Sequence, residues 1–506
     1  MASALTPALR EGLEKLVTSR LGLHFPQERS TELDRGISAA ARELGFPSSA
    51  AFIEGLLSSP PRRDHVEVLA SNLTVGETYF FRDPNTFNAL EQAVLPELIR
   101  RRQETRRLRI WSAGCATGEE PYSLAILLHK LIPDRKLWHI TILATDINSR
   151  FLKKAAGAAY GEWSFRDTPS WLKERYFTKT GEGRFELLPE IRSMVTFSHH
   201  NLAEDPYPSI LNNTNAMCLI LCRNVLMYFT PEAATRTIRA LRRSLVDGGS
   251  LIVGPCELST ALIDEFSAMT VPAVPIYVKR DSAASKPADV IQPRGFEQSS
   301  VASKVPAPNR RPLPEPAGVP PPGLPTNASG PPRSRTPVSD PLAEARRLYE
   351  SGLYQDAEGK ILSRMRSGRN DAEAMALLAR IYANQGNLAL AADWSEKAIA
   401  ADKLNSGNHY LHAVVLEEQG RVEEAAESLN RALYADPNFI LAHFSLGNLL
   451  RRLGRTRESR KCLRNALSLL RGCGREDVLA GSEGLTAGRL VEIILSTSGK
   501  DDGDEG

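Results

Sequence analysis

The sequence predicts a multidomain protein with an all-α N-terminal region, an α/β domain and a C-terminal array of paired helices. Residues 1–75 show helical periodicity without strands. From about residue 108, strands and helices alternate, which favours a mostly parallel sheet covered by helices. Beyond residue 340, small residues recur every 34 positions, which indicates a helical repeat array.

Length and charge limit the functions to be considered. With 506 residues, the chain has room for about three domains. Its 63 Lys and Arg residues nearly balance its 60 Asp and Glu residues, and no basic patch is interleaved with aromatic residues. We therefore expect no nucleic-acid partner. Because no leader and no apolar run of ~18 residues is recognisable, we expect a cytoplasmic protein without direct membrane insertion.

Six cysteines provide neither a disulfide framework nor a CxxC pair. Cys218 and Cys222 lie four residues apart in the apolar run MCLILC, which is typical of a buried strand. We interpret them as core thiols rather than metal ligands, and we predict no metal site.

Amphipathic helices account for the first part of the chain. Apolar residues recur at helical spacing over 9–17, 33–44 and 52–57. Prolines separate these stretches, because proline disrupts a helix interior. We assign residues 1–80 to an N-terminal helical domain and 81–280 to the α/β domain.

Residues just past each strand of the α/β domain are the candidates for ligand binding, because open parallel sheets bind ligands there. The first strand leads into SAGCATGEEPYS, where Gly114 and Gly118 allow close backbone approach near a helix start. The second strand ends at Asp146, which can accept hydrogen bonds from ribose hydroxyls or cap the following helix. The pair predicts an adenosine-containing ligand. NAD and S-adenosylmethionine remain candidates, whereas ATP is not expected without a Lys-Ser/Thr phosphate loop.

Residues 281–340 hold 14 of the 33 prolines and form a predicted disordered linker. Downstream, Gly352, Gly386, Gly420 and Gly454 are spaced by 34 residues, as are Ala357, Ala391, Ala425 and Ser459. This spacing resembles the tetratricopeptide repeat over 341–471, which implies an α-solenoid with a groove for a protein partner. We expect the tail, 472–506, to be at most partly helical.

Five motifs in the first 280 residues occur in an order that resembles the chemotaxis receptor methyltransferases of the CheR type, which are glutamate O-methyltransferases. They are LTVGETYFFRD (73–83), WSAGCATGEEPYS (111–123), ATDIN (144–148), HNL (200–202) and LCRNVLMYF (221–229). The resemblance implies a doubly wound S-adenosylmethionine-dependent methyltransferase domain with a small antiparallel β insert at about 160–195. It also implies that the substrate is a glutamate on the cytoplasmic helices of a chemoreceptor.

The resemblance also implies a role for individual residues. Arg82 and Tyr228 would be catalytic, Tyr228 by facing the acceptor. The residues implied in cofactor binding are Gly76, Thr78, Arg82, Glu120, Asp146, Asn201, Leu202, Arg223 and Asn224. Two of these interpretations have structural alternatives. Arg82 could form a surface ion pair with Asp83 or Glu77, and Tyr228 could be a core aromatic beside Phe229.

The sequence departs from the family pattern at three places. Gly76 stands where an Asn that bonds the cofactor is frequent, and Cys218 stands where an Asp is common. The stretch 28–43 mixes three Arg with four acidic residues, whereas enteric members carry a strongly basic receptor-docking helix there.

The predicted acceptor explains why no catalytic His is needed. A glutamate is already ionised at pH 7, so no general base has to generate the nucleophile. An Arg can align that carboxylate through two parallel hydrogen bonds. The alternative prediction is a catalytically weak cofactor-binding scaffold in a chemosensory pathway, which the Gly76 departure motivates.

Overall fold

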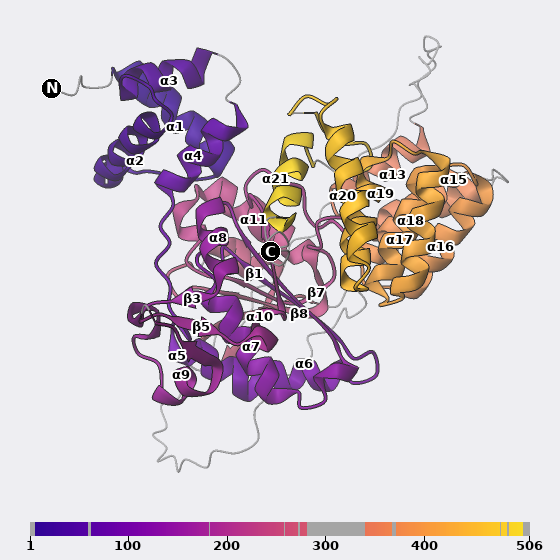
Figure 1. Cartoon of the computed structure of the whole chain (residues 1–506), viewed down its shortest axis with the longest axis horizontal. Coiled ribbons are helices and arrows are strands. Elements are labelled where there is room, and N and C mark those ends of the chain that lie inside the picture. The colour runs from indigo at the N-terminus through magenta and orange to yellow at the C-terminus, as the bar shows by residue number, and fades with distance from the viewer. Residues whose placement is uncertain are drawn as a thin grey trace, which may run out of the picture.

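The computed structural model describes residues 6–58, 62–181, 183–257, 259–271, 274–280, 340–366, 371–475, 477–482 and 485–498 (Figure 1). The predicted linker, 281–340, lies outside the described residues except for Asp340. The described part of the chain contains no helix that is both long and apolar enough to span a membrane. In the same ranges, no group of three or more His, Cys, Asp or Glu side chains is arranged to hold a metal ion.

The N-terminal region is helical, as predicted. The three predicted stretches form α1 (Pro7–Leu21), α2 (Ser30–Glu43) and α3 (Ser49–Ser58), and α4 (Arg63–Leu73) follows them. Thr6 caps α1 by accepting a hydrogen bond from the Leu9 N–H, and Gly22 ends it with a φ of 71°. The apolar stripes that predicted these helices meet in one core, in which Leu13, Ile37 and Phe52 are at most 1% exposed.

The α/β domain is built on a seven-stranded sheet with the order β6-β2-β1-β7-β8-β10-β9. The five parallel strands are β1 (Arg107–Ala113), β2 (His139–Asp146), β6 (Val195–His199), β7 (Met217–Cys222) and β8 (Leu245–Val253). The antiparallel edge consists of β9 (Ser267–Val271) and β10 (Val274–Val278). The chain runs outward from β1 on one side and returns to β7 on the other. The strand order therefore reverses between β1 and β7, where open α/β sheets bind ligands.

Helices cover both faces of this sheet, which confirms the doubly wound fold. The first apolar cluster contains residues of α5 (Pro84–Ala89), α6 (Leu95–Arg101) and α7 (Glu119–Leu131). The second contains residues of α11 (Pro231–Ser244) and α12 (Thr260–Glu265). Cys218 and Cys222 are both buried in β7, one toward each cluster.

A separate antiparallel sheet follows α8 (Ser149–Gly157), which confirms the predicted β insert. Its strands, in the order β3-β5-β4, are β3 (Ala159–Tyr160), β4 (Phe177–Lys179) and β5 (Phe185–Leu187). The helix α9 (Ser170–Tyr176) precedes β4, and α10 (Pro189–Arg192) follows β5. Phe80 links the insert to the ligand-binding side, because its ring stacks on Phe165 at a centroid distance of 5.1 Å.

Four helix pairs form the repeat region. They are α13 (Pro341–Glu350) with α14 (Tyr354–Met365), α15 (Ala372–Asn384) with α16 (Leu388–Ala401), α17 (Ser406–Glu418) with α18 (Val422–Ala435), and α19 (Ile440–Arg452) with α20 (Thr456–Leu470). Each of the four spaced glycines turns the chain within a pair, with φ between 74° and 79°. This left-handed conformation explains the 34-residue glycine column. In the predicted tail, α21 (Ala487–Ser498) packs on α20.

Candidate active site

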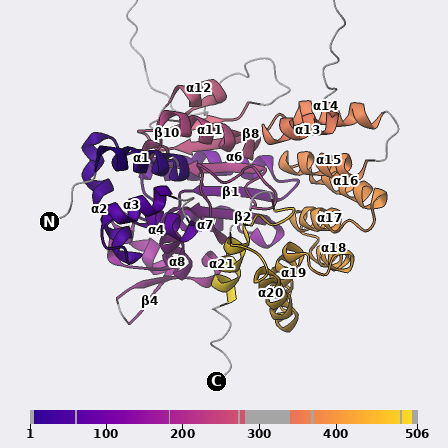
Figure 2. The same ribbon diagram turned by 90° about the horizontal axis from the view of Figure 1, so that it is seen from above.

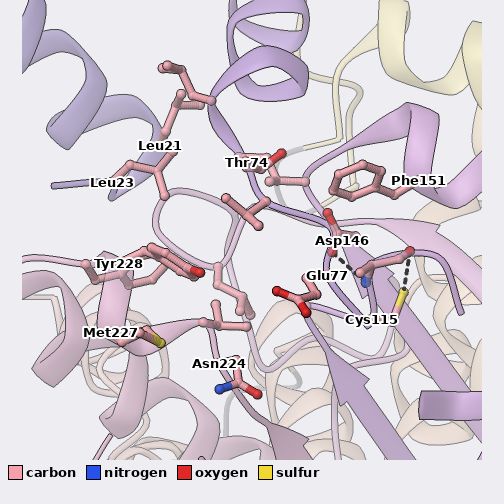
Figure 3. A pocket seen from close by; sticks show the side chains of 18 of the residues that line it. Leu21, Leu23, Thr74, Glu77, Cys115, Asp146, Phe151, Asn224, Met227 and Tyr228 are labelled. Carbon is pink, nitrogen blue, oxygen red and sulfur yellow. Dashed lines mark hydrogen bonds between the residues drawn. The ribbon is translucent and has the colours of Figure 1, made fainter. Parts of the chain in front are cut away.

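A cavity of about 220 Å³ opens at the carboxyl ends of β1, β2 and β7, between the sheet and the N-terminal helices (Figure 3). Of the ten residues implied by the sequence motifs, nine line it: Thr78, Arg82, Glu120, Asp146, Asn201, Leu202, Arg223, Asn224 and Tyr228. Gly76 is not among the lining residues, although its neighbours Val75 and Glu77 are.

The turn after β1 holds its backbone close to the loop after β7. Gly114 has a φ of 82°, and a Cβ there would collide with the side chain of Val225. The Gly114 and Cys115 N–H groups both donate to the carbonyl oxygen of Thr145, at 2.8 and 2.9 Å. The glycine therefore allows three loops to converge beside the cavity.

Asp146 is buried at the end of β2 and does not cap the next helix. Asn148 is the N-cap of α8, since its side chain accepts from the Arg150 and Phe151 N–H groups. The Asp146 carboxylate instead accepts from the N–H groups of Ala116 at 2.9 Å and Asn148 at 2.8 Å. The carboxylate still has lone-pair capacity for a ligand hydroxyl. Burial raises the pKa of Asp146 from 3.8 to about 6.

We expect Asp146→Ala to weaken S-adenosylhomocysteine binding by ~1–3 kcal/mol, because hydroxyl donors of the ligand lose a buried acceptor. Calorimetric titration measures this loss directly. A dissociation constant equal to that of the wild type would contradict a ligand-binding role for Asp146.

The same carboxyl predicts a pH dependence. Its raised pKa favours the protonated form in the unliganded fold, so its contribution to stability is present below pH ~4 and is lost as the pH rises through ~6. Ligand hydroxyls favour the ionised carboxylate. The affinity for S-adenosylhomocysteine should therefore rise as the pH rises from ~4 through ~6. Because His200 also lines the cavity and burial lowers its pKa to about 4, the measurement compares wild type with Asp146→Asn. A pH profile unchanged in Asp146→Asn would assign the dependence to another group.

Arg223 organises the polar floor of the site. Its guanidinium donates to Glu120 and Asp83, each at 3.2 Å, and to the carbonyl oxygen of Arg82 at 3.1 Å. Glu120 also accepts from the Ser112 hydroxyl at 2.7 Å. The Arg223 Nε–H is buried and has no partner within the described ranges. It is therefore a donor available to a polar ligand, as expected for a residue beneath a cofactor.

Arg82 reaches the cavity without a carboxylate partner among the described residues. Its guanidinium donates to the carbonyl oxygen of Glu77 at 2.5 Å. The two acids suggested as its surface partners are engaged elsewhere, Asp83 with Arg223 and Glu77 with Arg166. The structure thus does not contain the surface ion pair that was the alternative interpretation.

Tyr228 is held by the N-terminal region rather than by the core of the sheet. The His24 N–H donates to its carbonyl oxygen at 2.7 Å, and the Arg29 guanidinium lies 5.1 Å from its ring centre. Figure 3 shows its hydroxyl directed into the cavity, on the side opposite Asp146. Tyr228 therefore lines the cavity, and its side chain also packs with Phe229 against the core of the N-terminal helices.

Asn201 lies on the cavity wall, but its side chain serves the fold. Its amide donates to the carbonyl oxygen of Arg20 at 2.7 Å, and its oxygen accepts from the Ala203 N–H at 3.0 Å. The side chain thereby joins the end of α1 to the loop after β6. Contact of the Asn201 side chain with the adenine region, which the resemblance implies, would require these bonds to be shared.

Two groups of site residues escaped sequence reasoning. Apolar and aromatic residues after α1, including Leu23 and Phe25, form the cavity wall facing Tyr228, and no motif marks them. Glu257 accepts four backbone N–H bonds, from Asn224, Val225, Met227 and Gly254. Its position just past β8 was a usable signal, because strand ends in this sheet carry the site.

Gly76 lies against Phe151, which explains why a larger residue is absent. A Cβ at position 76 would fall within 3.0 Å of several ring carbons of Phe151. Phe151, at the start of α8, also lines the cavity. The aromatic ring therefore occupies the space that a side chain at position 76 would need.

We expect Gly76→Ala to lower the free energy of unfolding by ~1–3 kcal/mol, because the methyl group overpacks this contact. Phe151→Leu should relieve the strain. The double variant should therefore lose less unfolding free energy than the two single variants lose together. Thermal denaturation of the four proteins checks this. Additive effects would show that Gly76 and Phe151 are energetically independent.

Comparison with known proteins agrees with this geometry. Residues 76–274 match the family described as CheR methyltransferase, SAM binding domain. Residues 413–454 and 441–469 match tetratricopeptide repeat families, and 350–432 match subunit 3 of the anaphase-promoting complex.

Several curated relatives span the catalytic part. A chemotaxis protein methyltransferase of Listeria monocytogenes is 32% identical over 244 residues, which are 48% of this chain and 87% of the relative. The probable biofilm formation methyltransferase WspC of Pseudomonas aeruginosa is 28% identical over 358 residues, covering 69% of this chain and 80% of the relative. An uncharacterized 104.1 kDa protein of Rhodobacter capsulatus is 35% identical over 209 residues, and the chain spans 21% of its length.

Proposed function

Since this chain belongs to the CheR family of S-adenosylmethionine-dependent chemotaxis protein methyltransferases, we propose that it methylates glutamate side chains of chemoreceptors. The family's activity is methylation in chemotaxis-type signalling. Our proposal adds that the methyl acceptor is a glutamate. The product would be a glutamate methyl ester on the cytoplasmic helices of a receptor.

The observation that carries this proposal is the position of Arg82. It is a cation at the cavity without a carboxylate partner among the described residues, and the Tyr228 hydroxyl is directed into the same space. A glutamate carboxylate would supply the missing negative charge. An ionised carboxylate is already a nucleophile at pH 7, so the absence of a general base beside Arg82 is no obstacle.

The residues of the cavity fit the cofactor as well. Asp146 has free lone pairs for ribose hydroxyls, and the orphaned Arg223 Nε–H is a donor for a polar group. When bound, S-adenosylmethionine supplies an electrophilic methyl group on a sulfonium. Arg82 would orient a carboxylate, either the acceptor's or the cofactor's own, and Tyr228 would donate to a carboxylate oxygen. The wall formed by Leu21, Leu23 and Phe25 would exclude water from the reacting groups.

The surface of α2 supports docking of an acidic receptor helix despite its mixed composition. Three of the acids in this stretch are neutralised by arginines: Glu32 by Arg29, Asp34 by Arg10 and Glu43 by Arg150. Arg35 and Arg42 are exposed and form no ion pair within the described ranges. The helix therefore presents two unpaired cations to an acidic partner.

The test is methyl transfer from labelled S-adenosylmethionine to a chemoreceptor cytoplasmic fragment. The expected product releases labelled methanol in mild base, which is typical of a carboxylate ester. A receptor fragment with its acceptor glutamates replaced by alanine is the matched control. Stable, base-resistant label would identify another acceptor. Cofactor binding without transfer to any receptor fragment would favour the alternative of a cofactor-binding scaffold.

The repeats supply a second part of the proposal. Tetratricopeptide arrays bind protein segments on the surface formed by their stacked helices. We propose that this region recruits a further protein partner to the methyltransferase.

A further inference from the structure

The repeats pack against the sheet edge at which β1, β2, β7 and β8 begin, opposite the candidate active site (Figure 2). Three successive repeat turns make this contact. A Cβ at Gly352 would meet Arg243 of α11, one at Gly386 would meet Ala216 and Val246, and Gly420 lies near His139. The contact therefore runs along consecutive repeats, and no described residue of the repeats lines the cavity.

Residues 209–216 of the catalytic domain, the 209–216 segment, extend this contact into the apolar interior of the repeats. Ile210 is 3% exposed and belongs to the hydrophobic cluster built from α13 to α17. Leu211 packs against that cluster and also against the cluster built from α17 to α21. Two adjacent aliphatic side chains of one domain thus complete the core of the other.

A cationic anchor accompanies the aliphatic pair. Arg109 of β1 is 5% exposed and donates to Glu418 of α17 at 2.5 Å, and to the carbonyl oxygens of Asn213 and Asn215 at 3.0 and 3.1 Å. Arg107 reaches the same Glu418 oxygen at 3.2 Å. Without these arginines, Glu418 would be a largely buried carboxylate without a counter-charge, which is unfavourable.

The contacted helices belong to one face of the repeat array. Asn215 donates to the carbonyl oxygen of Ala383 on α15 at 3.0 Å, and Val414 and Glu418 lie on α17. Figure 2 shows α13, α15 and α17, the first helices of their pairs, toward the sheet domain, with α14, α16 and α18 farther out. We call the surface around Ala383, Val414 and Glu418 the inner face.

We propose that the inner face is a peptide-recognition surface that the 209–216 segment keeps occupied. Its external partner is a protein segment with two adjacent aliphatic side chains beside a cationic one, the chemistry that Ile210, Leu211 and Arg109 present. Because the internal segment belongs to the same chain, it competes at high effective concentration. An external partner binds by displacing the catalytic domain. Its apparent dissociation constant therefore rises as fewer molecules have an inner face that the 209–216 segment has left. The inference builds on the proposed partner recruitment and is independent of the methyl acceptor.

The test uses the full chain and a fluorescent peptide with the sequence of residues 205–217 carrying Asn213→Arg. The arginine supplies the cation that Arg109 provides in the chain. Leu211→Asp in the protein opens the inner face, and Leu211→Met is the matched control that keeps an apolar side chain. A peptide that also carries Ile210→Asp and Leu211→Asp controls for nonspecific binding.

A second variant closes the face instead of opening it. A Cβ at position 386 would lie 3.2 Å from the Ala216 Cβ, slightly closer than in an unstrained disulfide, so Ala216→Cys with Gly386→Cys can be cross-linked after a small shift of the two segments. The exposed Cys256 is replaced by serine in this variant. The reduced form of the same protein is the control.

We expect the peptide to bind Leu211→Asp at least about tenfold more tightly than wild type or Leu211→Met. Oxidation of the cysteine pair should abolish binding, and reduction should restore the wild-type level. An unchanged dissociation constant for S-adenosylhomocysteine shows that the catalytic domain remains folded in each variant. Equal binding to wild type and Leu211→Asp, no binding to Leu211→Asp at 1 mM peptide, or wild-type binding by the cross-linked protein would each overturn the proposal.

Discussion

Arg82→Ala is expected to reduce methyl transfer about a thousandfold while leaving the fold intact. Arg82 contributes a single side-chain hydrogen bond to the structure, to the carbonyl oxygen of Glu77, and it is not part of an apolar core cluster. Loss of an aligned charge at a reacting centre typically lowers the rate by a factor of ~10²–10³. The measurement is single-turnover transfer at saturating cofactor, with thermal denaturation as the control for folding.

The conservative variant separates the two roles open to Arg82. Lysine keeps the charge but loses the planar pair of donors, so Arg82→Lys should recover only part of the rate. If Arg82 orients the acceptor, the dissociation constant for S-adenosylhomocysteine stays unchanged in both variants. If it orients the carboxylate of the cofactor, that constant rises in parallel with the loss of rate. Near-wild-type turnover in Arg82→Ala would remove Arg82 from the site.

Glu257→Gln is expected to have the second largest effect, on both stability and activity. Each carboxylate oxygen of Glu257 accepts two backbone N–H groups, and the residue is 6% exposed. An amide nitrogen would confront two of these donors, which leaves buried N–H groups unpaired. We expect the free energy of unfolding to fall by ~2–4 kcal/mol.

The effect on activity follows from the loop that Glu257 holds. Asn224 has a φ of 59°, and three of the four bonds fix residues 224–227 immediately before Tyr228. A displacement of about 1 Å at a reacting group can lower a rate about a hundredfold. We expect a loss of that order, measured well below the melting temperature. Cys256→Ser, at the exposed neighbouring position, is the matched control. A Glu257→Gln protein with wild-type melting and turnover would show that the loop is held by other contacts.

Prediction from sequence succeeded where the signal is local. The runs LRIWSAG, ITILATDIN, MCLILC and SLIVGP are continuous apolar stretches because parallel strands are buried on both faces, and they form β1, β2, β7 and β8. The short strands β6, β9 and β10 were not predicted. The run LCRNVLMYF leaves the strand after Cys222. Glu257 accepts the N–H groups of this loop and thereby stabilises its irregular backbone.

The roles of individual site residues needed the fold. Asp146 was equally compatible with a helix cap until Asn148 was seen to cap α8. Asn201 belongs to a recognisable motif, yet its amide bonds to Arg20, 181 residues away. Neither spacing nor periodicity could reveal such a pair, because the two residues meet only when the N-terminal helices pack against the α/β domain.

The resemblance to a known family implied S-adenosylmethionine as the cofactor and named the members of the motif series. From its residues alone, the sequence predicted the fold class, the glycine column of the repeats and an adenosine-containing ligand at the strand ends. These depend on short-range patterns: period-34 spacing, apolar runs, and residues placed at strand ends. The tertiary structure decided that Phe151 takes the space beside Gly76, that Glu257 holds the loop before Tyr228, and that the 209–216 segment fills the inner face of the repeats. Each of these joins residues far apart in the chain. These contacts stabilise the protein only after folding has brought the buried charges and apolar side chains into contact.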